Sequence, residues 1–270
     1  AYNLVGKIPH KQFIFSKLML GKNATSDEIK SFKHLGYPYA FEPDADTGAA
    51  VLRLGENQTY RPEELVAFVL SYAKQIAENH AGGKAEIKDA VITVPAYFRE
   101  TERRAMLSAA SIAGLNVLSL MHEQTAFAFK YGFDKEAEFS VDEPTNIVFY
   151  NMGASSFKVS VVAFSRVVGK KNRTTGSMAV RGVAYDETLG GRNFAAVVTD
   201  MLIEHFEKTH PKASSPRTSA KAMGKLRKEA ERIKDVLSAN TQFQVGIEGV
   251  HEDRDIRMVI KRADFEERAS

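Results

Sequence analysis

The sequence predicts an α/β protein of two lobes, on three observations. A chain of 270 residues is long enough to bury two cores. Strand and helix patterns alternate between Ala90 and Gly132, as in α/β units. After Thr145, two runs of β-branched and aromatic residues flank a short turn, which is typical of a hairpin. We therefore expect α/β units first and a sheet of hairpins after them.

The composition excludes several classes of protein. With 44% hydrophobic and 26% charged residues the chain is globular. Its 37 basic and 34 acidic residues give a net charge of only +3, so we expect no nucleic-acid partner. Cysteine is absent, which excludes disulfides and thiolate metal sites. No apolar run is long enough to cross a bilayer, and we expect no membrane partner.

The N-terminal part has weak patterns until a clear helix begins. Phe13-Ile14-Phe15 is a candidate short strand, and Val51 to Leu54 alternates weakly. A helix begins near Pro62, because proline suits the first helical position. It carries an apolar stripe and ends by Gly82-Gly83; the stripe consists of Leu65, Phe68, Val69, Tyr72 and Ala73.

The α/β units follow, with a strand, a helix, a second strand and a second helix. Proline ends the first strand, Gly114 ends the first helix in a position that favours a left-handed cap, and Gly132 ends the second helix. The predicted ranges are Ala90 to Pro95, Thr101 to Ala113 before Gly114, Asn116 to Leu120, and Glu123 to Tyr131 before Gly132. The polar stretch Lys135 to Pro144 is the candidate boundary between lobes spanning residues 1–142 and 143–270.

The second half opens with the hairpin, Thr145 to Val162. A strand near Met178 to Val183 and a helix from Asn193 to Lys208 follow. The helix Ser219 to Leu237 has apolar residues at spacings of three and four, which indicates a packing face. Two short strands and the start of a helix complete the chain.

The hairpin turn Gly153-Ala154-Ser155-Ser156 contains only small side chains. Its backbone N–H groups and hydroxyls can approach an anion closely, as phosphate-binding turns do. An ordinary tight hairpin turn explains the same residues. Both readings stay open at this point.

Four segments, in order, resemble the nucleotide-binding domain of the heat-shock 70 kDa protein family. They are Asp89 to Phe98, Ile112 to Leu118, Asp186 to Gly191, and Leu226 to Asn240. The resemblance implies an actin-like (ribonuclease-H-like) ATPase fold of two lobes with ATP or ADP between them. It is partial at both ends: the family's first phosphate hairpin would precede Ala1, and its adenosine-binding glycine turn would follow Ser270. We therefore expect the biological protein to be longer.

Within the family, the chain looks like a large, divergent member of the endoplasmic reticulum. Glu102 to Ala105 and Ser238 to Asn240 resemble the large, divergent members. Arg181 to Asp186 and Ile247 to Val250 resemble the branch of the endoplasmic reticulum. N-glycosylation triplets at Asn23, Asn57 and Asn172 agree with the reticulum lumen, the alternative being the cytoplasm. The resemblance implies a chaperone for unfolded polypeptides that also serves as nucleotide-exchange factor for a standard heat-shock 70 partner.

The resemblance also implies roles for individual residues, each with a plainer alternative. Lys17 aligns with the catalytic lysine that holds the γ-phosphate and attacking water, although a lysine there is usually a surface residue. Glu123 aligns with a glutamate near the metal's water shell, or is a helix N-terminal acid. The phosphate contacts fall on Gly153, Ala154, Ser155 and Ser156, and on Gly190 and Gly191, which otherwise form a helix-start turn.

Adenosine contacts fall on Glu231, Lys234 and Ser238, which share one helical face; a solvated polar face is the alternative. Asp235 stands where the family has a basic residue that stacks on adenine, which weakens the expected grip. A larger departure lies at the first turn. Asn151 and Lys158 replace two family aspartates.

An amide supplies neither the charge that Mg²⁺ prefers nor a proton acceptor. We therefore assign no metal ligand, expect weakened Mg²⁺ binding, and treat Asn151 as a degenerate catalytic position. Lys158 offsets phosphate charge directly in this reading. We predict nucleotide binding with slow or absent hydrolysis. A fully active ATPase and, less favoured, a sugar-kinase-like phosphotransferase of the same fold are the alternatives.

Overall fold

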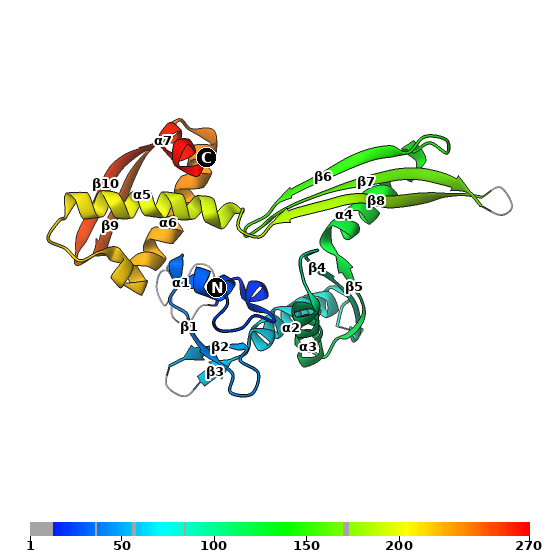
Figure 1. Ribbon diagram of the computed structural model, residues 1–270, viewed down its shortest axis with the longest axis horizontal. Helices are drawn as coiled ribbons and strands as arrows, with labels where there is room; N and C mark the ends of the chain where they lie inside the picture. Colours follow the sequence, from blue (N-terminus) through cyan, green and yellow to red (C-terminus); the bar gives the residue numbers. More distant parts are fainter. Residues whose placement is uncertain (1–12, 36, 56–57, 84, 170–172) are drawn as a thin grey trace. The chain divides into compact units, whose positions relative to one another are not determined.

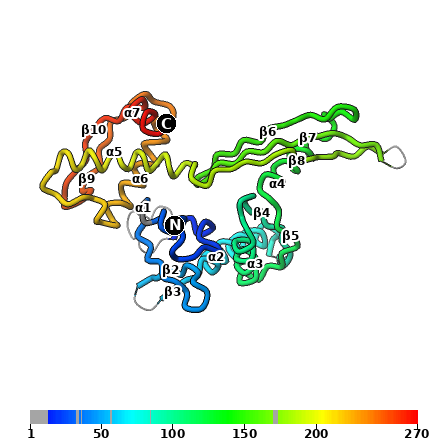
Figure 2. Tube along the Cα trace, viewed as in Figure 1, coloured from blue at the N-terminus to red at the C-terminus, as the bar shows by residue number. Residues whose placement is uncertain are grey.

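The computed structural model of the chain describes residues 13–35, 37–55, 58–83, 85–169 and 173–270. Two compact units form, one from residues 1–66 and 191–270, the other from residues 67–190. The chain enters the second unit along α2 (Pro62–His80) and leaves it before α5 (Gly191–Thr209) (Figures 1 and 2). The predicted lobes, 1–142 and 143–270, stay a prediction. The glycosylation triplets at Asn57 and Asn172 begin outside the described residues.

The N-terminal part of the first unit is a small antiparallel sheet with short helices. Its elements are η3 (Ser16–Met19), α1 (Asp27–His34), β1 (Ala40–Pro43), β2 (Ala50–Leu54) and β3 (Gln58–Tyr60). Met19, Phe32 and Leu52 are buried at its centre. The strand predicted at Phe13-Ile14-Phe15 is wrong. Phe15 has a left-handed backbone (φ 61°) and starts the 3-10 helix, a geometry that a strand does not allow.

The C-terminal part of the first unit packs two long helices and a hairpin. Its elements are α5, η6 (Pro216–Thr218), α6 (Ala220–Ala239), β9 (Gln242–His251), β10 (Arg254–Lys261) and α7 (Arg262–Ala269). Ser219 caps α6 by accepting a hydrogen bond from the backbone of Ala222. The predicted packing face is confirmed, since Leu226, Ile233 and Leu237 are buried in the core that α5, α6 and the hairpin share.

The second unit contains the predicted α/β pair. Its elements are β4 (Asp89–Val94), α3 (Glu100–Ile112), β5 (Asn116–His122) and α4 (Glu123–Asp134), and β4 pairs with β5 in parallel. Gly114 has a positive φ of 69° after α3, as predicted for a left-handed cap. The apolar stripe of α2 differs from the usual core-facing pattern, because Phe68, Val69 and Tyr72 are exposed.

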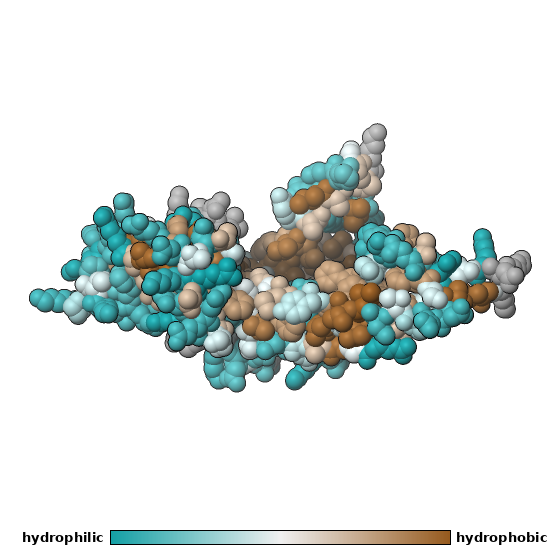
Figure 3. Space-filling view, turned by 90° about the horizontal axis from the view of Figure 1, so that it is seen from above, coloured by the Kyte–Doolittle hydropathy of each residue, from teal (hydrophilic) through white to brown (hydrophobic). Residues whose placement is uncertain are grey.

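A three-stranded antiparallel sheet completes the second unit. Its strands are β6 (Thr145–Met152), β7 (Phe157–Val168) and β8 (Thr174–Asp186), with β7 in the centre. Helix α4 packs on one face, where Ala128 meets Val162 and Phe164. Apolar side chains also reach the surface in patches (Figure 3), and those exposed on the sheet include Val148 and Tyr150. Among the described residues, no helix combines the length and apolar character needed to cross a membrane.

Gly132 does not end α4, as the sequence suggested, because the helix continues to Asp134. The glycine serves packing instead. A Cβ atom on Gly132 would lie 2.7 Å from the ring of Phe164, which is 1% exposed and stacks on Phe139 at 5.0 Å. A side chain is therefore absent where α4 packs against the ring of Phe164.

We expect Gly132→Ala to destabilise the second unit. Overpacking costs about 1–3 kcal/mol, which outweighs the gain of about 1 kcal/mol from replacing a helical glycine by alanine. Urea denaturation should show a net loss of about 1 kcal/mol. The matched control is Gly182→Ala in β8, where a Cβ would meet nothing within 4 Å. It should be neutral or slightly stabilising, and equal effects of the two substitutions would contradict the packing role.

Candidate functional site

The turn of small residues lies where the sequence placed it, between β6 and β7. Met152 pairs with Phe157, and the backbone N–H of Gly153 donates to the carbonyl of Ser156 at 2.9 Å. Ser156 is 3% exposed, and its hydroxyl accepts a hydrogen bond from the Tyr97 hydroxyl at 3.4 Å. The turn is thus anchored from inside by a tyrosine that the sequence analysis did not assign to the site, although Tyr97 lies in the quoted segment Asp89 to Phe98.

Gly190 packs directly on this turn. A Cβ atom on Gly190 would lie 2.7 Å from the carbonyl carbon of Ser155 and from the nitrogen of Ser156. No side chain fits there, because real Cβ atoms do not approach backbone so closely. Gly191 follows and is the first residue of α5. The two glycine segments that the sequence linked to phosphate binding therefore meet in the structure.

A buried ion pair lies beside the turn. Lys158 follows Ser156 by two residues on the inward face of β7, opposite Asn151 in the strand register. Its Nζ donates to Oε2 of Glu123 at 2.5 Å, with the two side chains 9% and 14% exposed. The same Nζ lies 5.9 Å from the centre of the Tyr97 ring. The lysine is therefore paired with the glutamate that the resemblance placed near a metal.

The surroundings of this pair are polar. Ser156, Lys158 and Ser160 alternate along β7 and are all buried, before Val162 and Phe164 continue the same face as apolar core. Gln124 follows Glu123 and is 3% exposed. The amide of Gln124 and the hydroxyl of Ser160 have no hydrogen-bond partner within the described part of the chain. Sequence reasoning missed both, although the period of two from Ser156 would have pointed to Ser160.

His122, the N-cap of α4, is also held by a specific contact. Arg103 Nη2 lies 2.7 Å from His122 Nε2. Burial, and then the positive charge of Arg103, lower the pKa of the His122 imidazole. A neutral ring accepts the arginine's hydrogen bond at this distance. The start of α4, and with it Glu123, is thereby fixed from the side of α3.

The predicted adenosine residues lie on α6, in the first unit. Lys234 forms an ion pair with Glu231, and the Ser238 hydroxyl donates to the carbonyl of Lys234 at 3.1 Å. One helical face carries all three, as predicted. Lys17 lies on η3 in the same unit.

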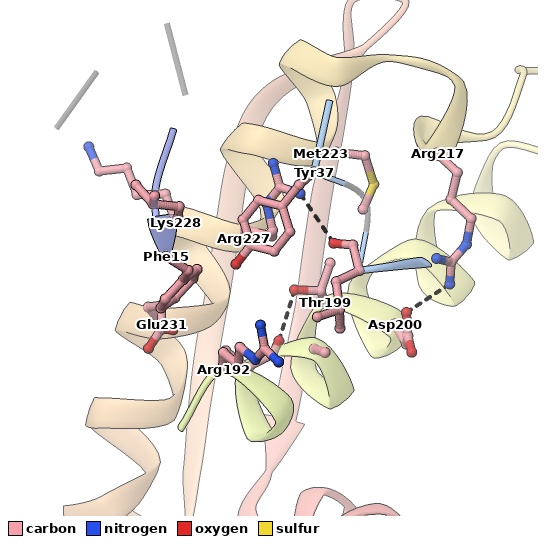
Figure 4. Close-up of a pocket in the computed structure, with 14 residues that line it drawn as sticks. Phe15, Tyr37, Arg192, Thr199, Asp200, Arg217, Met223, Arg227, Lys228 and Glu231 are labelled. Carbon is pink, nitrogen blue, oxygen red and sulfur yellow. Dashed lines mark hydrogen bonds and ion pairs between the residues drawn. The ribbon is translucent and has the colours of Figure 1, made fainter. Parts of the chain in front are cut away.

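Glu231 also borders a cavity of about 190 Å³ between the N-terminal segment and helices α5 and α6. Figure 4 shows aromatic and arginine side chains around it. The guanidinium of Arg227 lies 4.3 Å from the centre of the Tyr37 ring and donates to the Leu35 carbonyl at 3.2 Å. Arg192 lies 5.6 Å from the ring of Phe15. Of the side chains that line this cavity, only Glu231 was a predicted site residue.

The predicted site residues thus form two groups, one on each unit. The second unit brings together the turn Gly153 to Ser156, Gly190, Asn151 and Glu123. The first unit carries Gly191, Lys17 and the α6 residues. That both groups bind one nucleotide stays a prediction.

The donor set beside the turn does not fit a divalent cation. Magnesium prefers carboxylate and water oxygens. Here Asn151 offers an amide, and the Glu123 carboxylate binds an ammonium group. No group of three or more histidine, aspartate or glutamate side chains suited to a metal occurs among the described residues. Glycine turns, hydroxyls and a lysine fit a phosphate better.

Comparison with known proteins gives one consistent result. The model of the Hsp70 protein family matches residues 5–270. Hypoxia up-regulated protein 1 of Danio rerio is 36% identical over 266 residues, which is 98% of this chain and 27% of the relative. The Xenopus laevis protein of the same name is 34% identical, with 99% and 41% covered. Heat shock 70 kDa protein 17 of Arabidopsis thaliana is 35% identical, with 99% and 30% covered. The chain therefore spans less than half the length of these relatives.

Proposed function

The chain belongs to the Hsp70 protein family, and we propose that it is the nucleotide-binding part of a large chaperone in which ATP or ADP acts mainly as a conformational ligand. The observation that carries this proposal is the contact of Gly190 with the Ser155–Ser156 peptide. Two turns without bulky side chains meet there, and such turns present backbone N–H groups to phosphate oxygens. Gly153 to Ser156, Gly190 and Gly191 would hold the phosphates, and Glu231, Lys234 and Ser238 the adenosine.

Hydrolysis would be slow or absent. Phosphoryl transfer depends on positioning and on charge that stabilises the transition state, with a group that orients or deprotonates the attacking water. Asn151 cannot accept a proton, and Glu123 is held by Lys158. The absence of a general base typically lowers a rate by about 10²–10⁴-fold. Lys17 would then hold the γ-phosphate without driving its release.

A ligand that binds one arrangement of two units better than another shifts the population toward it, with or without turnover. In the whole protein, we infer that this shift regulates the affinity for unfolded polypeptides. It would also regulate nucleotide exchange on a standard heat-shock 70 partner. We place the protein in the lumen of the endoplasmic reticulum, in keeping with the acceptor triplet at the exposed Asn23.

Titration calorimetry with ADP and ATP, combined with phosphate-release assays on the full protein, tests this function. We expect binding of both nucleotides and turnover that Lys17→Ala leaves unchanged within error. Lys88→Ala is the matched control, because Lys88 is a solvent-exposed lysine whose ion-pair partner is Glu86. Turnover that Lys17→Ala abolishes and Lys88→Ala preserves would establish the active ATPase instead. No affinity for either nucleotide would refute the proposal.

A further inference from the structure

We propose that the buried ion pair of Lys158 and Glu123 takes the place of the divalent cation, so that this site binds the phosphates of metal-free nucleotide. The inference rests on the proposed nucleotide-binding function and adds the form of nucleotide that the site takes. In this view the lysine is a built-in cation, and magnesium contributes nothing to affinity.

The position of Lys158 suits this role. It lies two residues from Ser156, inside the protein, with its Nζ near the Tyr97 ring. The Tyr97 hydroxyl in turn contacts Ser156, so the lysine and the turn share one anchor. An ammonium group has three N–H donors, and one of them goes to Glu123. Donors therefore remain for phosphate oxygens at the turn.

The charges at the same place disfavour a divalent cation. Magnesium would be repelled by the ammonium of Lys158 and would compete with it for the Glu123 carboxylate. Opposite Lys158, Asn151 supplies only a neutral amide oxygen. Such a site lacks the carboxylate charge with which proteins usually hold magnesium.

The polar interior around the pair is a second, independent observation. A buried amide without a hydrogen-bond partner lowers stability, so helix–sheet interfaces are normally apolar. Here Gln124 follows Glu123 on α4, and Ser160 follows Lys158 by two residues on the same face of β7. Both are buried and have no such partner within the described residues. Buried polar groups next to the ion pair in the sequence of α4 and β7 favour a polar occupant near it.

The pair also sets the strength of anion binding. Glu123 compensates the charge of Lys158, so the pair by itself is close to neutral. Removing the carboxylate charge while keeping its shape, as in Glu123→Gln, leaves the lysine for the phosphates alone. We expect metal-free ADP to bind this variant about tenfold more tightly, because hydrogen bonds to an uncompensated charge are the stronger ones.

The main experiment is calorimetric titration of the full protein with ADP, once in EDTA and once with excess magnesium chloride. We expect magnesium to leave the affinity unchanged or to lower it, and to raise it by no more than about threefold, because excess Mg²⁺ complexes the free ADP that the site takes. An affinity that rises more than about threefold with magnesium overturns the inference and leaves the proposed function intact. Failure to bind in both buffers refutes the proposed function itself. The two failures are therefore distinguishable.

Two variants sharpen the test. Lys158→Asp restores an acid, so ADP affinity in EDTA should fall at least about tenfold and recover with magnesium. The matched control Lys88→Asp changes an exposed lysine by the same charge and should behave as the parent.

Electron paramagnetic resonance of Mn²⁺ gives a readout independent of affinity. The parent with ADP should not deplete free Mn²⁺ beyond ADP alone, whereas Lys158→Asp should. Depletion by the parent, or an unchanged affinity of Glu123→Gln and Lys158→Asp alike, overturns the inference.

Discussion

Replacing Glu123 by glutamine should lower the free energy of unfolding of the second unit by about 3 kcal/mol. The substitution leaves the ammonium of Lys158 buried without a compensating charge, and breaking a buried pair in this way costs about 3–5 kcal/mol. We expect the low end of this range because the side chains of Lys158 and Glu123 remain 9% and 14% exposed. Urea denaturation followed by circular dichroism, with hydrogen exchange of β7 to localise the loss, measures the effect.

The matched control is Glu86→Gln, which breaks the exposed pair of Glu86 with Lys88 at 3.1 Å. An exposed pair contributes about 0–1 kcal/mol, so this variant should be close to the parent. The double variant Glu123→Gln with Lys158→Gln should recover part of the loss, because no buried charge remains. Equal effects of Glu123→Gln and Glu86→Gln would show that the buried pair contributes no more to the free energy of unfolding than the exposed pair.

The single variant links stability to ligand binding. A ligand that binds only the folded state raises stability by an amount that grows with its concentration relative to the dissociation constant. If the uncompensated lysine binds phosphate more tightly, ADP should raise the melting temperature of Glu123→Gln more than that of the parent. The variant is then less stable alone and more responsive to nucleotide.

Replacing Gly190 by alanine should displace the turn Gly153 to Ser156. The new Cβ would lie within 2.8 Å of three backbone atoms of Ser155 and Ser156, and backbone cannot move aside as a flexible side chain can. Overpacking of this kind costs about 3 kcal/mol at the upper end of its usual range. Displacement of the turn should also raise the dissociation constant of ADP about 100-fold, if the same 3 kcal/mol or so is lost from the free energy of binding.

Thermal denaturation and ADP titration of Gly190→Ala measure the two effects. Gly153→Ala is the control for stability, because a Cβ there would make an ordinary 3.5 Å contact with the Ser156 carbonyl oxygen. It should unfold near the temperature of the parent. A Gly190→Ala protein that keeps the parent's melting temperature would mean that Gly190 and the turn do not pack as described.

Local signals in the sequence placed most elements correctly. Pro62, Ser219 and Gly114 mark helix ends through their own backbone or side-chain chemistry, and the hairpin from Thr145 follows from alternation. Local signals failed where a distant side chain decided the outcome. The sequence predicts that Gly132 ends the helix. In the structure the glycine is needed because the ring of Phe164 leaves no room for a side chain there.

By itself, then, the sequence determined the α/β order, the small-residue turn and the family, because each depends on neighbouring residues or on ordered motifs. Only the tertiary structure decided that Lys158 pairs with Glu123, 35 residues away, and that Gly190 touches Ser155. Such contacts follow from strand register and from where α4 packs, and a one-residue shift of register would turn Lys158 to the other face of the sheet. No periodicity within either segment encodes that choice.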